Sequence, residues 1–279
     1  MTHPHPLDPQ AAAQGRAKIE QMKRTFEQKK SIADSLGRIK NKIGVYSGKG
    51  GVGKTTVAVN LAVTLAQDGA SVGILDVDVD CPNVVRAMKI AEPPVVGEDK
   101  KLIPPERFGV RVMSMGFFQE NEEEAIIWRG PMIHNAINQL IQSTDWGDLD
   151  YLVIDLPPGT SDSPLTVMQT LTLDGFVVVT TPQELAKIDA KRSVNMIRKL
   201  KVNVLGVVEN FSGSIFGSGA GEDLANEMNL PFLGRLELRK DYRDTSRPTV
   251  LNSKAVRSEY QQLAKQTVKK LEKGAEGAA

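Results

Sequence analysis

The sequence predicts an α/β fold with one doubly wound, mostly parallel sheet covered by helices on both faces. Short apolar runs recur without polar alternation, which is typical of strands buried on both faces. Segments with helical periodicity separate most of these runs, as parallel strands require. The apolar runs occupy residues 43–47, 72–76, 110–115, 151–155, 176–180, 204–208 and 232–233. The helical patterns occupy residues 55–67, 132–142, 185–200 and 253–271.

The composition narrows the class of protein. The chain has 279 residues, of which 41% are hydrophobic, and this suffices for one large domain with a full core. The net charge of +1 gives no reason to expect a nucleic acid or an anionic membrane as partner. Cys81 is the single cysteine, so no intrachain disulfide holds the fold. Without a transmembrane-length apolar stretch or a secretory signal, we expect a cytoplasmic protein.

Three regions are expected along the chain. Residues 1–40 form a Pro- and His-rich tail and a charged helical arm, residues 41–272 form the catalytic domain, and residues 273–279 form a disordered tail. The arm has few apolar positions, which suit packing on the core better than binding a partner. These positions are Ile19, Met22, Phe26 and Ile32.

A glycine-rich loop lies between the first predicted strand and helix. Residues 48–55 read GKGGVGKT, which matches the phosphate-loop pattern G-x-x-x-x-G-K-[ST] in its required context. The glycines allow backbone N–H groups to point at phosphate oxygens, Lys54 reaches the β- and γ-phosphates, and the Thr55 hydroxyl ligates Mg²⁺. The sequence therefore predicts a nucleotide site made by Gly48, Lys49, Gly50, Gly51, Val52, Gly53, Lys54, Thr55 and Thr56.

Carboxylates follow two predicted strands. Asp76, Asp78 and Asp80 end the strand at 72–76, and Asp155 ends the strand at 151–155. The carboxyl ends of parallel strands face the ligand crevice, where carboxylates beside phosphates are useful only if Mg²⁺ or a water needs them. We predict that Asp155 holds Mg²⁺ directly or through water, and that Asp80 caps a helix or a turn.

Lys49, directly after the first glycine, resembles the deviant phosphate loop of the MinD/ParA class. The resemblance implies ATP-dependent homodimerisation, with Lys49 reaching the partner's nucleotide. It also implies that Asp78 orients the attacking water from a first switch, beside Mg²⁺, and that the turn at 157–159 is a second switch. The catalytic set is then Lys49, Lys54, Asp78 and Asp155. No Asn-Lys-x-Asp element is present, which favours ATP over GTP.

Further segments resemble the Mrp/ApbC family of iron–sulfur cluster carrier ATPases. They are WRGPM at 128–132, DWG at 145–147, DYLVIDLPPGT at 150–160, TPQE at 181–184 and VVEN at 207–210. The resemblance implies a homodimeric ATPase that transfers a [4Fe–4S] cluster to apo-proteins or assists a related carrier. It also implies that Asn210 contacts the adenine.

The chain departs from that family at its cluster site. Members usually carry a C-x-x-C pair after the segment that contains Asn210, whereas residues 209–217 here read ENFSGSIFG. The usual site is therefore absent, since an iron–sulfur cluster needs several thiolate ligands. Cys81 could supply two ligands from two copies of the chain, although a residue without a ligand role is the better interpretation.

Two other functions were weighed. A MinD/ParA-like positioning or regulatory ATPase would use nucleotide-driven dimerisation to expose a partner or membrane surface. The amphipathic segment 253–271 has too few large apolar residues for a membrane-binding helix and suits packing on the core. A scaffold that binds nucleotide without turnover is disfavoured by the intact Lys54, Thr55, Asp78 and Asp155. The sequence therefore predicts slow ATP hydrolysis by a switch protein.

Overall fold

The computed structural model describes residues 18, 20, 22–23, 26–27, 30, 32–118 and 130–276. Its main sheet has eight strands in the order β10-β9-β8-β1-β7-β2-β6-β5, and all neighbours are parallel except β5 and β6. This confirms the predicted sheet. The strands are β1 Ile39–Tyr46, β2 Val72–Asp76, β5 Glu106–Arg107, β6 Val110–Ser114, β7 Leu149–Asp155, β8 Gly175–Thr180, β9 Val204–Ser212 and β10 Phe232–Glu237.

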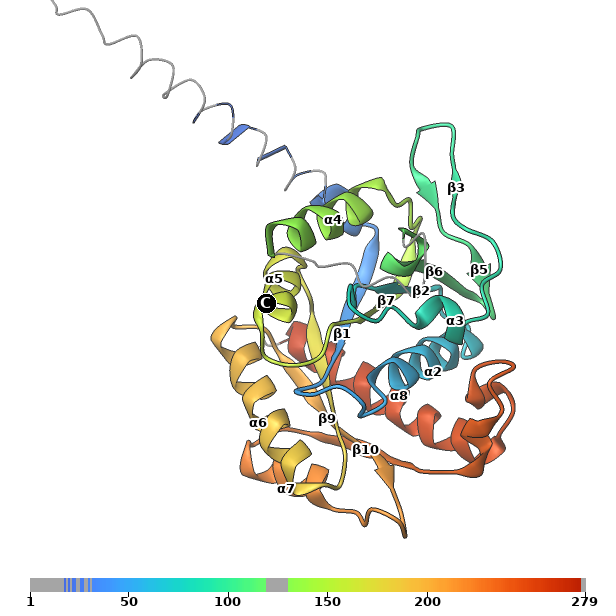
Figure 1. The fold of residues 1–279 in the computed structure, drawn as a ribbon, viewed down its shortest axis with the longest axis vertical. Coiled ribbons are helices and arrows are strands. Elements are labelled where there is room, and N and C mark those ends of the chain that lie inside the picture. Colours follow the sequence, from blue (N-terminus) through green and yellow to red (C-terminus); the bar gives the residue numbers. More distant parts are fainter. Residues whose placement is uncertain are drawn as a thin grey trace, which may run out of the picture.

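Helices cover both faces of this sheet (Figure 1). α2 and α8 lie together on one face, and α4 to α7 lie on the other. The helices are α2 Lys54–Gln67, α3 Val84–Ala87, α4 Gly130–Ser143, α5 Asp162–Thr170, α6 Glu184–Lys199, α7 Ala220–Glu227 and α8 Lys254–Glu276. None of the helices within the described ranges is long and apolar enough to cross a membrane.

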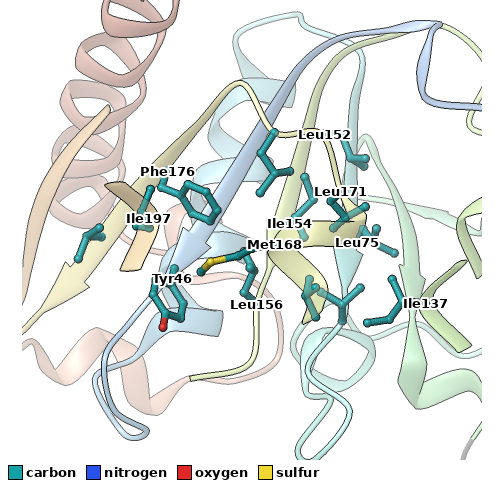
Figure 2. Close-up of a cluster of buried hydrophobic side chains, with 14 of the residues drawn as sticks. Tyr46, Leu75, Ile137, Leu152, Ile154, Leu156, Met168, Leu171, Phe176 and Ile197 are labelled. Carbon is teal, nitrogen blue, oxygen red and sulfur yellow. The ribbon is translucent and has the colours of Figure 1, made fainter. Parts of the chain in front are cut away.

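Each face of the sheet has its own buried cluster, which explains why the strand sequences lack polar alternation. In β7, Leu152 and Ile154 face the α4–α7 side, whereas Val153 between them faces α2 and α8. Figure 2 shows the cluster on the α4–α7 side. In it, the rings of Tyr46 and Phe176 pack edge to face, with their centroids 6.3 Å apart. Buried apolar side chains cover both faces, so the carboxyl edge of the sheet is left for polar chemistry.

The structure differs from the prediction at the end of the last helix and at three short strands. α8 continues to Glu276, so residues 273–276 are helical and not part of a disordered tail. The hairpin of β3 (Val95–Val96) and β4 (Leu102–Ile103), like β5, was not predicted, because two-residue strands carry no periodic signal.

The described part of the N-terminal arm divides in two. Met22 and Phe26 are 65% and 70% exposed, so the predicted packing on the core is wrong for these two side chains. Ile32 packs against the core as predicted. The predictions for residues 1–17, Ile19, Trp128 and Arg129 concern positions outside the described residues.

Candidate functional site

Three neighbouring strands bring the predicted site together at one edge of the sheet. In the parallel register, Asp155 of β7 is level with Val45 of β1 on one side and with Asp76 of β2 on the other. β1 ends two residues before Gly48, and the glycine-rich loop leads directly into α2 at Lys54. The loop and the carboxylates therefore share the carboxyl edge, as the doubly wound topology requires.

Asp155 binds both side chains that end the loop. Lys54 Nζ lies 2.6 Å from Asp155 Oδ1, and Thr55 Oγ1 donates to Asp155 Oδ2 over 2.6 Å. Lys54 Nζ also lies 3.5 Å from Asp78 Oδ2. Lys54, Asp78 and Asp155 are all buried, and the last has no exposed surface. The structure thus brings together the four predicted side chains Lys54, Thr55, Asp78 and Asp155.

Lys54 is a single cation between two carboxylates. Burial alone would lower the pKa of Lys54, but the carboxylates of Asp155 and Asp78 outweigh burial and raise it, so the ammonium stays charged. Burial raises the pKa of Asp78, and Lys54 opposes this shift. Charges of both signs are already removed from water at this point. A bound triphosphate can therefore replace the carboxylates as the partner of Lys54, and a metal ion can replace Lys54 as the partner of the carboxylates.

Asp76 has a role that the sequence analysis did not assign. Its carboxylate accepts hydrogen bonds from the backbone N–H groups of Asp78 and Val84 and from the Ser114 hydroxyl, at 3.1, 3.1 and 3.0 Å. Burial, with Asp155 nearby, raises the pKa of Asp76 to about 8. Asp76 therefore fixes the segment that carries Asp78. Its position in the sequence does not distinguish a carboxylate with this role from one that ligates the predicted Mg²⁺.

The prediction that Asp80 caps a helix or turn is not confirmed at α3. That helix begins after Asn83, and the N–H of Val84 at its start donates to Asp76 instead. Asp80 is exposed. Asp80 lies three residues before Asn83, the residue that precedes α3, and Asp76 accepts the first amide of that helix in its place.

Close approaches explain the glycines of the loop. Gly51 and Gly53 have φ of 77° and 80°, which side chains rarely adopt. A β-carbon on Gly48 would lie 2.2 Å from the carbonyl oxygen of Asp189 in α6, and one on Gly53 would lie 2.3 Å from Asn210 Nδ2. Gly50 and Gly51 have open space around them, as the exposed tip of the loop requires.

Lys49 lies at the start of the loop and is half-buried. Its Nζ reaches Gln183 Oε1 at 3.5 Å, just before α6 begins. Lys49 therefore lies at the same edge of the sheet as Lys54, close to the segment that follows β8. Its reach to a partner's nucleotide stays a prediction.

The predicted second switch is tied to the phosphate loop. The N–H of Gly159 donates to the carbonyl of Ser47 over 3.0 Å, and the Tyr46 hydroxyl donates to the carbonyl of Gly159. Gly159 is thus hydrogen-bonded to Tyr46, the last residue of β1, and to Ser47, which directly precedes the loop. A shift of the 157–159 turn would therefore act directly on the residues that lead into the phosphate loop.

A pocket of about 530 Å³ opens beside Thr55 and Thr56 at the start of α2. Most of the residues that line it could not be predicted from the sequence, because the segment after β10 carries no motif. Asn210 is buried beside the loop and donates from Nδ2 to the carbonyl of Val52 over 2.8 Å. Besides Thr55 and Thr56, the residues that line the pocket include Asn83, Phe211, Leu238, Tyr242, Thr245 and Pro248.

Cys81 is exposed, and its backbone N–H donates to Asp78 Oδ1 over 3.2 Å. After Asn210, where the carrier family usually has its C-x-x-C pair, residues 213–217 form a tight turn in which Gly213 and Gly217 exchange two backbone hydrogen bonds. Among the residues that the structure describes, no group of three or more His, Cys, Asp or Glu side chains could hold a metal ion. A single described chain therefore has no iron–sulfur ligand set.

A strand, a glycine-rich loop, a helix that begins with Lys54 and Thr55, and a carboxylate from a neighbouring strand define a P-loop nucleoside triphosphatase. Residues 38–272 match the family model described as "ParA: NUBPL iron-transfer P-loop NTPase". The chain belongs to this family, as the resemblance to the Mrp/ApbC carriers predicted.

Known proteins agree with this assignment. An iron–sulfur cluster carrier protein of Methanocaldococcus jannaschii is 38% identical over 261 residues, which are 88% of this chain and 90% of the relative. A nucleotide-binding protein of Archaeoglobus fulgidus, solved with ADP, is 35% identical with a TM-score of 0.69, over 79% of this chain and 91% of its own. The cell division ATPase MinD of Pyrococcus furiosus shares the fold at 22% identity, with a TM-score of 0.65, over 82% and 99%.

Proposed function

We propose that this chain is an Mg²⁺-dependent, slow ATPase that acts in the assembly of iron–sulfur clusters or in their transfer to apo-proteins. One observation carries the ATPase part: Asp155 holds Lys54 and Thr55 together at the end of the phosphate loop, each at 2.6 Å. The cargo follows from the relatives, which are named iron–sulfur cluster carriers or transfer proteins. The alternative of a positioning ATPase rests on similarity of fold alone.

The side chains divide the work of phosphoryl transfer. Lys54 neutralises charge on the β- and γ-phosphates, and the backbone N–H groups of the loop bind the phosphate oxygens. Asp78, which is held in place by Asp76 through its own N–H, orients the attacking water in line with the γ-phosphorus. Lys54 lies between Asp78 and Asp155, so incoming phosphates can draw the ammonium away from both carboxylates.

The residues present fit a magnesium ion. Mg²⁺ prefers oxygen ligands and keeps several waters when it binds beside phosphates, so one hydroxyl and one or two carboxylates suffice. Thr55, Asp155 and Asp78 offer such oxygens at one point, and we propose that they hold the ion directly or through water. When bound, Mg²⁺ neutralises charge on the β- and γ-phosphate oxygens.

The chain's single thiol constrains the cargo. One cysteine in each chain cannot complete a cluster site, which needs several thiolates. We propose that the working unit is a homodimer whose two Cys81 side chains supply ligands, or that the chain assists a related carrier that supplies them. Both alternatives make apo iron–sulfur proteins the final recipients.

Anaerobic reconstitution with iron and sulfide tests this cargo. The reconstituted chain, with ATP and Mg²⁺, is mixed with an apo [4Fe–4S] enzyme, and recovery of that enzyme's activity is followed. We expect faster recovery than with the same iron and sulfide alone. Equal recovery would contradict cluster transfer by the chain itself and leave the role beside a related carrier, which predicts acceleration only when that carrier is added. In the Cys81→Ala variant, loss of bound iron and of the acceleration supports the homodimer, and an unchanged acceleration contradicts Cys81 as a ligand.

A further inference from the structure

Two carbonyl groups of the phosphate loop are each held by a buried side chain. The Ser47 hydroxyl donates to the carbonyl of Lys49 over 2.9 Å, and Asn210 Nδ2 donates to the carbonyl of Val52 over 2.8 Å. Ser47 has no exposed surface, and Asn210 has 3%. Ser47 directly follows β1, and Asn210 lies in β9, near the carboxyl end of that strand.

Holding these carbonyls also sets the direction of two N–H groups. No cis peptide bond is present in the described chain, and in a planar trans peptide the C=O and the following N–H point in opposite directions. The N–H of Gly50 is therefore directed away from Ser47, and that of Gly53 away from Asn210. Among the described residues, neither N–H donates to a protein acceptor. Both remain available for an anion.

The space around Asn210 leaves little freedom. A β-carbon on Gly53 would lie 2.3 Å from Asn210 Nδ2 and 3.1 Å from the ring of Phe211. Val52 is 2% exposed, so its carbonyl has no water to replace the amide. The carbonyl of Gly53 in turn accepts the N–H of Val57 over 2.9 Å and starts α2. Asn210 is thus packed against the loop at the residue where the helix begins.

We propose that Ser47 and Asn210 are positioning residues that preset the phosphate loop by holding the carbonyls of Lys49 and Val52. They turn the N–H groups of Gly50 and Gly53 toward the phosphates before the nucleotide arrives. For Asn210 this role is separate from the adenine contact that the family resemblance implies. The inference rests on the proposed nucleotide binding, and it predicts that both side chains affect the binding of phosphates without a base.

Inorganic tripolyphosphate with Mg²⁺ is a probe that lacks the base and ribose. Its affinity and that of ATP are measured by calorimetry for the full chain and for the variants Ser47→Ala and Asn210→Ala. Thr267→Ala is the matched control, because its buried hydroxyl also donates to a backbone carbonyl, but within α8. Circular dichroism at the working temperature verifies that each variant is folded.

We expect both variants to weaken tripolyphosphate about threefold to tenfold, the loss for one hydrogen bond, with the control unchanged. Ser47→Ala should weaken ATP by the same factor, and Asn210→Ala should weaken ATP at least as much. If Asn210→Ala weakens ATP but not tripolyphosphate, the inference is overturned for Asn210, which then contacts only the base. Should that variant not fold, Ser47→Ala decides: unchanged tripolyphosphate affinity overturns the inference. A wild-type chain that binds neither probe would instead overturn the proposed function, and the inference with it.

Discussion

At the scale of single residues, Lys54 is the cation that stabilises the buried carboxylates of the site. It is the cation beside Asp155 and Asp78, two carboxylates that the fold has removed from water. Such a cluster is stable only while each charge has a partner, because an isolated charge in the interior loses its hydration. The residue that a triphosphate needs is thus also the residue that stabilises the buried carboxylates of the folded chain.

Replacing Lys54 by alanine leaves Asp155 buried without its cation. We expect the free energy of unfolding to fall by about 3 kcal/mol, as for other broken buried ion pairs. Urea denaturation measures this loss. Lys49→Ala is the matched control from the same loop. Since the Lys49 side chain is half-buried and its hydrogen bond among the described residues is to Gln183 at 3.5 Å, we expect a change within about 0.5 kcal/mol. Equal losses in the two variants would refute this account of the cluster.

Sequence reasoning reached some residues of the site and not others. Lys54, Thr55 and Asp155 were predictable because the motif and the strand ends place them through local geometry. Asp76 was under-assigned, because a carboxylate that bonds amides looks the same in sequence as one that ligates a metal ion. The pocket wall around Tyr242 and Pro248 depends on the irregular segment after β10, which no periodicity describes.

At the scale of elements, the carboxylate of Asp150 links three segments at the amino edge of the sheet. Asp150, at the second position of β7, accepts from Lys40 Nζ of β1 over 2.8 Å and from the N–H and hydroxyl of Ser71 over 2.9 and 2.8 Å. The bond from Lys40, followed by those from Ser71, lowers the pKa of Asp150 to about 2. Three segments far apart in sequence are therefore joined at the opposite end from the active edge.

This pKa predicts an acid-dependent stability. The unfolded-state pKa of aspartate is about 3.9, so the lowered folded-state pKa means that the folded chain favours the ionised form. The contribution of Asp150 is fully present above the unfolded-state value and is lost as the pH falls toward about 2. We expect Asp150→Asn to lower the urea midpoint near neutral pH and to match the wild type at the acid end. A deficit that does not change with pH would contradict the assignment.

The element scale also shows why the sheet was predicted well. Strands such as β8 are buried on both faces and read as continuous apolar runs, which the doubly wound fold requires. The hairpin of β3 and β4 is short and exposed, so neither burial nor alternation marks it. The C-terminal limit of α8 was misplaced because Gly274 suggested an end, whereas the helix continues to Glu276.

At the scale of the whole molecule, the phosphate loop faces outward at the edge where α6 begins. Lys49 lies there beside Gln183, and Leu185 and Ile188 in the first turns of α6 are exposed. We predict that Lys49→Ala binds ATP as the wild type does but dimerises more weakly when ATP is present. Light scattering with and without ATP measures the dimer fraction. Equal fractions for the two proteins would contradict a role for Lys49 across the interface.

The most direct test of the account is the release of phosphate from ATP with Mg²⁺ by the wild type and by Lys54→Ala, both measured below the unfolding midpoint of the variant. The account predicts slow turnover by the wild type, and a loss of about 100-fold or more in the variant, because one preorganised charge at the transferred phosphoryl group is removed. Turnover that is the same in both proteins would contradict the assignment of the site.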